Sequence, residues 1–289
     1  MTATALEPRA GRRCHNALNP LHSVVYFAPE YDDMLAALGL ERGAMAYFAG
    51  RAAPLGGVTA GTVAATFYNF NHAIIAPVVP RAWDLASPAA VIDARLRIAD
   101  AVLTRLLGPD VLASDDLAEA ARLALRAAGA CTREARPLYA ANAELPVPER
   151  PHLALWHAAT LLREHRGDGH LAALAIAGLD GIEALVTHTA TGKGFNPRFV
   201  QRSRGWSPED WAAAQDRLRD RGLLDAEGEL TGRGVELRRE VEAMTDRLDR
   251  APYECLGAEG VERLTAVAGA VVGRVLAGGG FPQRYFGKA

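Results

Sequence analysis

The segment Trp206–Glu240 limits the fold of this chain more than any other. Ser207 is a favourable N-cap and Pro208 suits the first position of a helix, so a helix is predicted to begin here. Gly222 is predicted to end that helix. Residues 223–231 then place the turn-forming sequence Asp-Ala-Glu-Gly between two short pairs, which predicts a small β-hairpin before a second helix.

A helix, a hairpin and a helix in this order form the second half of a winged-helix fold. The first half of the chain repeats part of the pattern at an offset of about 115 to 130 residues. Residues 70–88 and 195–208 both begin with Phe-Asn and reach an Arg-x-Trp before Ser-Pro. Residues 106–125 resemble residues 223–241, which predicts a first wing and its exit helix. The alternative is that two Ala/Leu/Arg-rich helical stretches look alike by composition.

The predicted fold is mainly α with short β-wings, arranged as two tandem winged-helix-like halves. Residues 12–135 would form the first half and residues 152–257 the second. Residues 136–151 contain prolines and polar side chains, and they are predicted to be a linker and not a helix. Residues 258–289 would form a C-terminal helix and tail.

Composition favours a soluble helical protein without a cofactor. Hydrophobic residues make up 49% of the 289 residues, enough for a sizeable core, and the net charge is −2. Cys14, Cys131 and Cys255 are far apart in the sequence, which indicates free thiols in a reducing compartment and not a zinc site. The sequence contains no apolar run of membrane-spanning length and no signal-peptide core, so we expect a cytoplasmic location without a membrane partner. It also contains no GxGxxG motif, and we expect neither a redox cofactor nor a metal.

Several phrases along the chain resemble a known family. The predicted winged helix, together with HSVVYFAPE, YFAGRAAPLG, TFYNFN, LWHAATLLREHRGDGH and THTATGKGF, resembles an uncharacterised actinobacterial family of helix-turn-helix proteins. The likeness covers nearly the whole chain, but it implies no reaction. The second half alone also resembles the winged helix of MarR-type regulators, which implies DNA binding. Tandem winged helices also occur in some DNA glycosylases, but their Gln-x-Gln or Gln-x-Asp signature is missing here.

The charges of the predicted recognition helix, residues 208–221, do not favour reading DNA. The helix carries four acidic residues against three arginines, and the wing adds three more acids, whereas a polyanion requires cations. The preceding stretch Lys193–Arg204 is basic and contains no acid. It is either a solvated loop or an edge that binds phosphate or carboxylate. Nucleic acid is therefore an unlikely partner that the sequence does not exclude.

The densest polar cluster lies at residues 163–170. Gly167 and Asp168 indicate a sharp connection between two helices, with Asp168 as the N-cap of the second. That explanation leaves Glu164, His165 and His170 without a structural reason, and imidazoles beside carboxylates can transfer protons near neutral pH. We therefore predict these three as candidate catalytic residues, with ordinary polar contacts as the alternative. Their spacing matches no compact metal-ligand pattern.

Aromatic residues gather in three short clusters of the first half, at residues 26–31, 47–48 and 67–72. An aromatic core would explain the phenylalanines, but the neighbouring polar residues would each need a partner in a dry core. An apolar pocket with a few convergent polar groups is the usual form of a small-molecule site. The predicted ligand-binding residues are His22, Tyr26, Glu30, Arg51, Asn69, Asn71, Arg163 and His188.

Together these features predict a winged-helix-derived protein that binds a small, partly apolar organic molecule between its halves. A cofactor-free acid/base enzyme of specialised metabolism is one version of this function, with Arg51 or Arg163 binding an anionic group. A ligand-responsive DNA-binding regulator and a protein that only sequesters its ligand are the alternatives. The sequence leaves turnover and oligomeric state open, a homodimer included.

Overall fold

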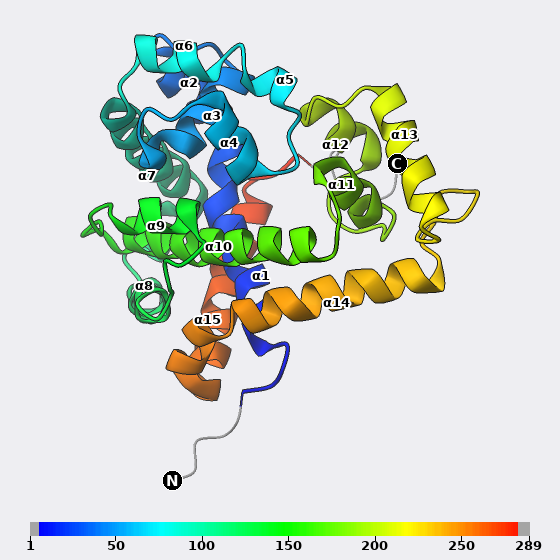
Figure 1. Ribbon diagram of the computed structural model, residues 1–289. Helices are drawn as coiled ribbons and strands as arrows, with labels where there is room; N and C mark the ends of the chain where they lie inside the picture. The colour runs from blue at the N-terminus through cyan, green and yellow to red at the C-terminus, as the bar shows by residue number, and fades with distance from the viewer. Residues whose placement is uncertain (1–5, 283–289) are drawn as a thin grey trace.

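The computed structural model describes residues 6–282, which form helices connected by short turns (Figure 1). The N-terminal part contains α1 (Ala10–Ser23), η1 (Val24–Phe27), α2 (Pro29–Ala36), α3 (Ala44–Ala52), η2 (Ala53–Leu55), α4 (Ala60–Phe67), α5 (His72–Ile75), α6 (Val79–Leu85), α7 (Pro88–Leu112), α8 (Asp115–Ala128) and α9 (Pro137–Ala143). The C-terminal part contains α10 (Pro151–Ile176), α11 (Gly181–Thr189), α12 (Pro197–Ser203), α13 (Pro208–Asp220), α14 (Gly232–Leu248) and α15 (Ala251–Ala277).

The largest hydrophobic core lies among α1, α7, α8, α10 and α15. It contains Cys14, Leu18, Leu117, Leu162 and Leu264, all almost completely buried. These residues come from both of the predicted halves. The main core is therefore shared between them, because α10 and α15 pack directly against the N-terminal helices.

A second cluster of buried residues comes mainly from α3–α6 and has three phenylalanines among its members. Phe48, Phe67 and Phe70 contact one another with ring centroids 5.1–6.2 Å apart. Tyr68 follows α4 with a positive φ of 54°, so the backbone turns sharply here. Because of this turn, the side chain of Tyr68 packs in a different core from those of Phe67 and Phe70. The turn thus places Phe70 beside Phe48 while Tyr68 joins the core of a different part of the chain.

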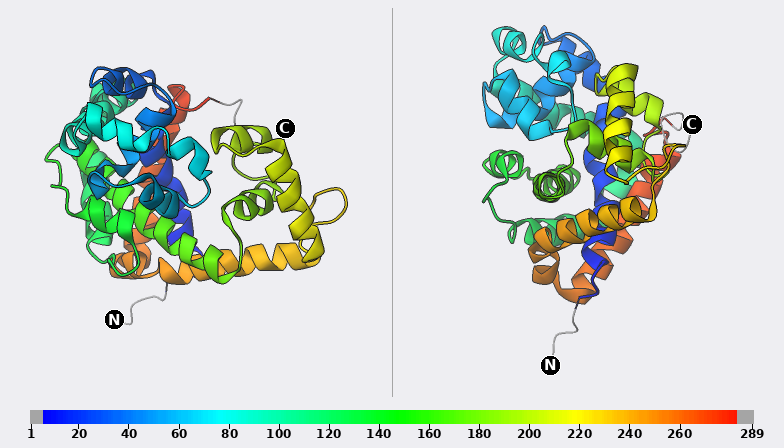
Figure 2. Two further views of the ribbon diagram at one scale, coloured as in Figure 1. Left: turned by 45° about the horizontal axis from the view of Figure 1, so that its top comes forward. Right: turned by 45° about the vertical axis from the view of Figure 1, so that its right-hand side comes forward.

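That third core combines residues of α11, α13 and the following hairpin with residues from the end of α10 and from α14. We call residues 181–231, which contain α11, α12, α13 and the hairpin, the α11–α13 unit. This unit lies to one side of the helical body, and α10 and α14 run side by side from the body to it (Figures 1 and 2). The Tyr68–Asn71 turn attaches to it by three hydrogen bonds. The Tyr68 hydroxyl donates to the Leu179 carbonyl at 2.5 Å, the Trp206 indole donates to the Asn69 carbonyl at 2.9 Å, and the Asn71 amide donates to the Arg204 carbonyl at 2.9 Å.

The predicted start and end of the helix after Trp206 are confirmed, whereas the predicted β-wing is not. Ser207 accepts a hydrogen bond from the Asp210 amide and Asp210 reciprocates, so α13 begins with a capping box. Gly222 has a φ of +68°, which glycine adopts without strain, and the helix ends there. The hairpin is held by a single antiparallel bridge between Leu224 and Leu230, whereas a full wing has two longer paired strands.

Three expectations for other segments are corrected. Residues 163–170 lie inside the uninterrupted helix α10 and contain no helix–helix connection. The predicted linker contains α9. Residues 106–125 fold as the end of α7 and most of α8, without a strand, so the predicted first wing is wrong and tandem winged-helix halves are not confirmed.

No single helix among residues 6–282 is long and apolar enough to cross a membrane. Helices α10 and α11 pass that test only as a pair, which is bent by 100°.

Candidate functional site

A cavity of about 1140 Å³ lies between the α11–α13 unit and the helices of the N-terminal part. One wall comes from α1, η1 and α3, and the opposite wall from α11, α12 and the loop between them. Its aromatic lining consists of Tyr26, Phe27, Tyr31, Tyr47, Phe48, Phe70, Phe195, Phe199 and Phe281. Cavities of this size with apolar walls are typical of sites for small organic molecules.

Buried ionic contacts lie against this cavity. Glu164 of α10 is 3% exposed, and its Oε1 lies 2.9 Å from Nη2 of Arg51 on α3. Arg163 also donates to Glu164 through its Nη1 atom. Burial raises the pKa of Glu164, but the charges of Arg163 and Arg51 outweigh burial and lower it to about 2. The carboxylate is therefore ionised at neutral pH and balances one of the two arginines.

His22 lies beside the same carboxylate, with its Nε2 atom 3.9 Å from Glu164 Oε1. The Thr160 hydroxyl donates to the Trp156 carbonyl at 2.9 Å, so it accepts a hydrogen bond from Nδ1–H of His22 at 2.9 Å. Burial lowers the pKa of His22 well below its usual value, against the charge of Glu164. His22 is thus neutral, and its Nε2 is a hydrogen-bond acceptor.

Six of the eight predicted ligand-binding residues line the cavity: His22, Tyr26, Arg51, Asn69, Arg163 and His188. The other two do not. Glu30 pairs with Arg105 at 2.6 Å, outside the cavity lining. Asn71 is the N-cap of α5, and its Oδ1 accepts from the Ala73 amide at 2.9 Å.

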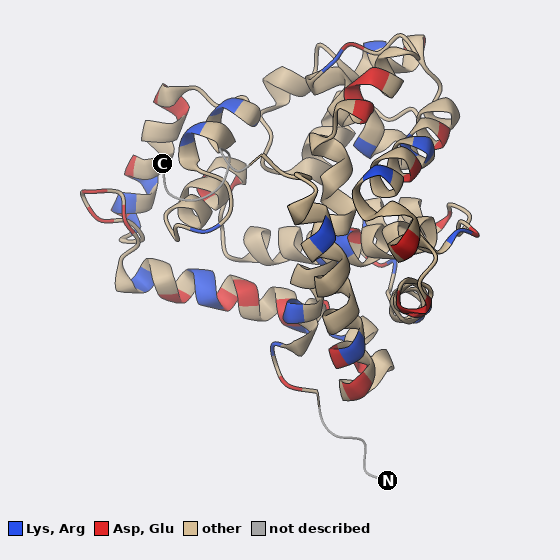
Figure 3. Ribbon diagram, turned by 180° about the vertical axis from the view of Figure 1, so that it is seen from behind, with Lys and Arg blue, Asp and Glu red and all other residues tan. Residues whose placement is uncertain are grey.

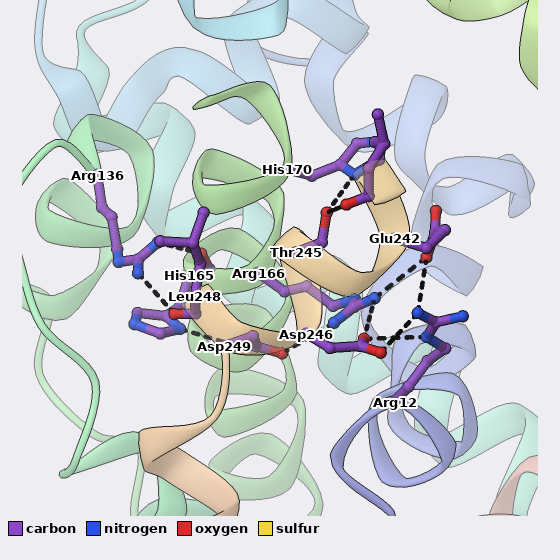
Figure 4. Close-up of polar contacts among 11 residues, drawn as sticks. Arg12, Arg136, His165, Arg166, His170, Glu242, Thr245, Asp246, Leu248 and Asp249 are labelled. Carbon is purple, nitrogen blue, oxygen red and sulfur yellow. Dashed lines mark hydrogen bonds and ion pairs between the residues drawn. The ribbon is translucent and has the colours of Figure 1, made fainter. Parts of the chain in front are cut away.

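Two of the three candidate catalytic residues lie elsewhere, in a polar network between α10 and α14 (Figure 4). His165 is 1% exposed and donates from Nδ1 to Asp249 Oδ1 at 2.8 Å. The Nδ1 of His170 lies 2.8 Å from the Thr245 hydroxyl. Only Glu164 reaches the cavity region, through its ion pair with Arg51. The three do not form one constellation, because side chains of α10 at these positions leave the helix in different directions.

The same network joins α1 to α14. Arg166 lies 3.0 Å from Asp246 and 3.5 Å from Asp249, and Arg12 pairs with Asp246 at 2.5 Å (Figure 4). A second cavity of about 860 Å³ borders these groups and is also lined by His15, His170 and His188. Its buried arginines already have carboxylate partners. We therefore interpret this network as the structural attachment of α14 to the body.

Arg204 and Tyr47 also line the cavity, although the sequence did not predict them as binding residues. The signal for Arg204 was present, since it ends the basic stretch for which a phosphate- or carboxylate-binding edge was one interpretation. Tyr47 was assigned only to an aromatic cluster. Its hydroxyl accepts from Arg51 Nη1 at 3.3 Å, which no spacing in the sequence indicates.

The arginines of α13 are engaged within the protein. Arg217 pairs with Asp180 at 2.9 Å and with Glu183 at 3.1 Å. Arg221 also contacts Glu183, at 3.0 Å, and Arg219 contacts Asp216 at 2.7 Å. Basic and acidic side chains alternate along the neighbouring α14 (Figure 3), so neither helix presents a uniformly basic face.

No group of three or more histidine, cysteine, aspartate or glutamate side chains within residues 6–282 is arranged to hold a metal ion. The model of a family described as a helix-turn-helix family matches residues 11–282. No curated protein and no solved structure matches the chain.

Proposed function

Because this chain belongs to a helix-turn-helix family, we propose that it is a regulator-like protein that binds a small, partly apolar organic molecule beside its α11–α13 unit. The observation that carries the proposal is the cavity of about 1140 Å³ whose walls belong to both the α11–α13 unit and the N-terminal helices. A ligand in this position contacts both parts at once. Its binding would therefore favour one orientation of the unit relative to the body.

The lining supports a ligand with ring systems and a few polar groups. Aromatic edges and faces surround the space, and pairs such as Tyr26 with Tyr47 lie with centroids 5.7 Å apart. Asn69 contributes an Oδ1 atom that is buried and has no hydrogen-bond partner among residues 6–282. A buried acceptor of this kind costs free energy until a donor reaches it. A ligand donor group would remove that cost.

The geometry does not favour acid/base turnover by the histidines that the sequence singled out. His165 and His170 are hydrogen-bonded to α14 and are not part of the cavity lining. We therefore propose binding without assigning a reaction.

Native mass spectrometry of the protein as purified, and titration with the neutral apolar fluorophore N-phenyl-1-naphthylamine, test the binding function. Ser203→Trp would place a large ring in the cavity, because Ser203 of α12 lines it. We expect at least tenfold weaker fluorophore binding than in the wild type. Arg198→Trp, on the same helix but exposed and outside the lining, is the matched control and should bind as the wild type does. Equal affinity of the Ser203 variant and the wild type would contradict the proposal.

DNA binding by the α11–α13 unit is a second candidate function, and membership of the helix-turn-helix family is the observation that favours it. Here α13 would be the recognition helix and the Leu224–Leu230 bridge the root of a short wing, in the manner of MarR-type regulators. The internal pairing of the α13 arginines leaves few cations for phosphates, so any complex would be weak and salt-sensitive.

A gel-shift assay against genomic fragments at low salt tests this second function. Binding confined to one sequence, and changed by the ligand, would establish a regulator. Absence of any shift at low salt would contradict DNA binding, and ligand binding would then be the proposed function that remains.

A further inference from the structure

The cavity carries more positive than negative charge. Arg51, Arg163, Arg202 and Arg204 line it. Glu164 is the buried carboxylate that meets them, and it pairs with Arg51 and Arg163. Asp32 also lines the space and is partly exposed, as is Arg163, whereas Arg202 is exposed. The inner wall thus has more guanidinium groups than carboxylates.

Arg202 and Arg204 are the lining arginines without a carboxylate partner within residues 6–282, and Arg204 is the less exposed of the two. Its Nη1 donates to the Ser203 hydroxyl at 3.0 Å, and its Cζ lies 4.5 Å from the centroid of Phe70 and 6.0 Å from that of Phe195. Its Nε atom is buried without a hydrogen-bond partner. No ion pair of Arg204 occurs within the described part of the chain. An unpaired guanidinium enclosed by rings is costly, because its charge has lost water without gaining an anion.

The surroundings of Arg204 show that this cost is not relieved inside the protein. Burial lowers the pKa of Arg204, Tyr47 opposes that change, and the nearby charges of Arg51 and Arg163 lower it further. Arg51 has a buried Nε without a partner as well, and its Cζ lies 4.5 Å from the ring of Phe67. Two guanidiniums with unused donors therefore lie beside aromatic rings in one cavity.

We propose that the ligand is an aromatic organic anion whose carboxylate, sulfonate or phosphate group is bound by Arg204, with Arg51 as the second donor. This inference rests on the proposed binding function and specifies its ligand class. The anionic oxygens accept hydrogen bonds from the guanidiniums, which are planar and suited to two-point contact with such groups. The ring system of the ligand occupies the space among Tyr26, Tyr47 and Phe70.

A pair of related fluorophores tests the charge requirement. 1-Anilinonaphthalene-8-sulfonate carries a sulfonate on an aromatic body, and N-phenyl-1-naphthylamine has the same body without the charge. Arg204→Met keeps a long apolar side chain and removes the cation. Arg198→Met, on the exposed face of α12, is the matched control. The thermal midpoint of each variant verifies that it is folded.

We expect Arg204→Met to bind the sulfonate at least tenfold more weakly, which corresponds to about 1.4 kcal/mol, while its affinity for the neutral probe is unchanged. The control variant should bind both probes as the wild type does, and each probe should displace the other from the wild type. An unchanged ratio of the two affinities in Arg204→Met would overturn the anion assignment while leaving the binding function intact. Failure of the wild type to bind either probe would overturn both.

Discussion

Glu164 allows the sharpest quantitative prediction, because it is buried among cations and its ionisation is linked to folding. Its pKa falls from 4.5 to about 2 in the folded protein, since the charges of Arg163 and Arg51 outweigh the effect of burial. At about 1.4 kcal/mol per unit, that difference corresponds to about 3 kcal/mol of stability at neutral pH. Removing one partner of a buried ion pair lowers the free energy of unfolding by a similar amount, about 3–5 kcal/mol. Glu164→Gln should therefore lower the free energy of unfolding by about 3 kcal/mol at neutral pH.

The pH dependence provides the stricter test. A carboxyl group with a lowered folded pKa stabilises the protein above its unfolded pKa, and this contribution is lost as the pH falls toward the folded value. The difference between wild type and Glu164→Gln should therefore shrink between about pH 5 and pH 2. Urea unfolding followed by circular dichroism at several pH values measures it. Glu7→Gln, which removes an exposed ion pair with Arg13, is the control and should change stability by less than about 0.5 kcal/mol. A constant difference between Glu164→Gln and wild type across this range would refute the reasoning.

Three further predictions concern the attachment of the two parts and the electrostatics of the cavity. Asp249→Ala should lower the free energy of unfolding by about 1–3 kcal/mol, measured by urea unfolding, because the buried Nδ1–H of His165 loses its acceptor. Gly181→Ala should lower the thermal midpoint by the equivalent of about 1–3 kcal/mol, since the new Cβ would lie 2.3 Å from the Tyr68 carbonyl oxygen. Burial raises the pKa of Tyr47, but the charges of nearby arginines outweigh burial and lower this pKa. An ultraviolet pH titration of Tyr47→Phe should therefore lose the tyrosine ionisation that occurs at the lowest pH in the wild type. An unchanged titration curve would contradict this.

Local capping rules worked where a segment's own residues decide its structure, and they failed where a distant segment competes. Ser207 caps α13 as expected. Asp168 instead remains inside α10, where its Oδ2 accepts from the amides of Leu138 and Tyr139 at 3.1 and 2.9 Å and so caps α9. Gly169 lies where a Cβ would be 2.8 Å from Arg136 Nη1. The Gly-Asp-Gly sequence therefore serves contacts across the fold and does not end a helix.

The candidate site was predictable in part. The clustering of aromatic residues, with polar residues that a dry core would not accept, identified Tyr26, Arg51 and Asn69, which line the cavity. His22, Arg163 and His188, which also line it, were predicted to reach or close the same site. The roles assigned to His165 and His170 were not supported by the geometry, because a sequence shows that imidazoles are near carboxylates along the chain but not which way they point around a helix. Glu164 and His165 are neighbours in α10, so their side chains leave the helix in directions about 100° apart. Glu164 therefore contacts Arg51 beside the cavity, whereas His165 contacts Asp249 in the α14 network.

The sequence by itself determined the helical character, the capped helix and hairpin after Trp206, and the concentration of rings in the first half. These features depend on interactions between near neighbours in the chain. The tertiary structure alone decided that Arg204 would lie against Phe70 without a carboxylate, and that one core would join both halves. Such outcomes depend on how whole helices pack, because burial and charge pairing are set by residues more than a hundred positions apart in the chain.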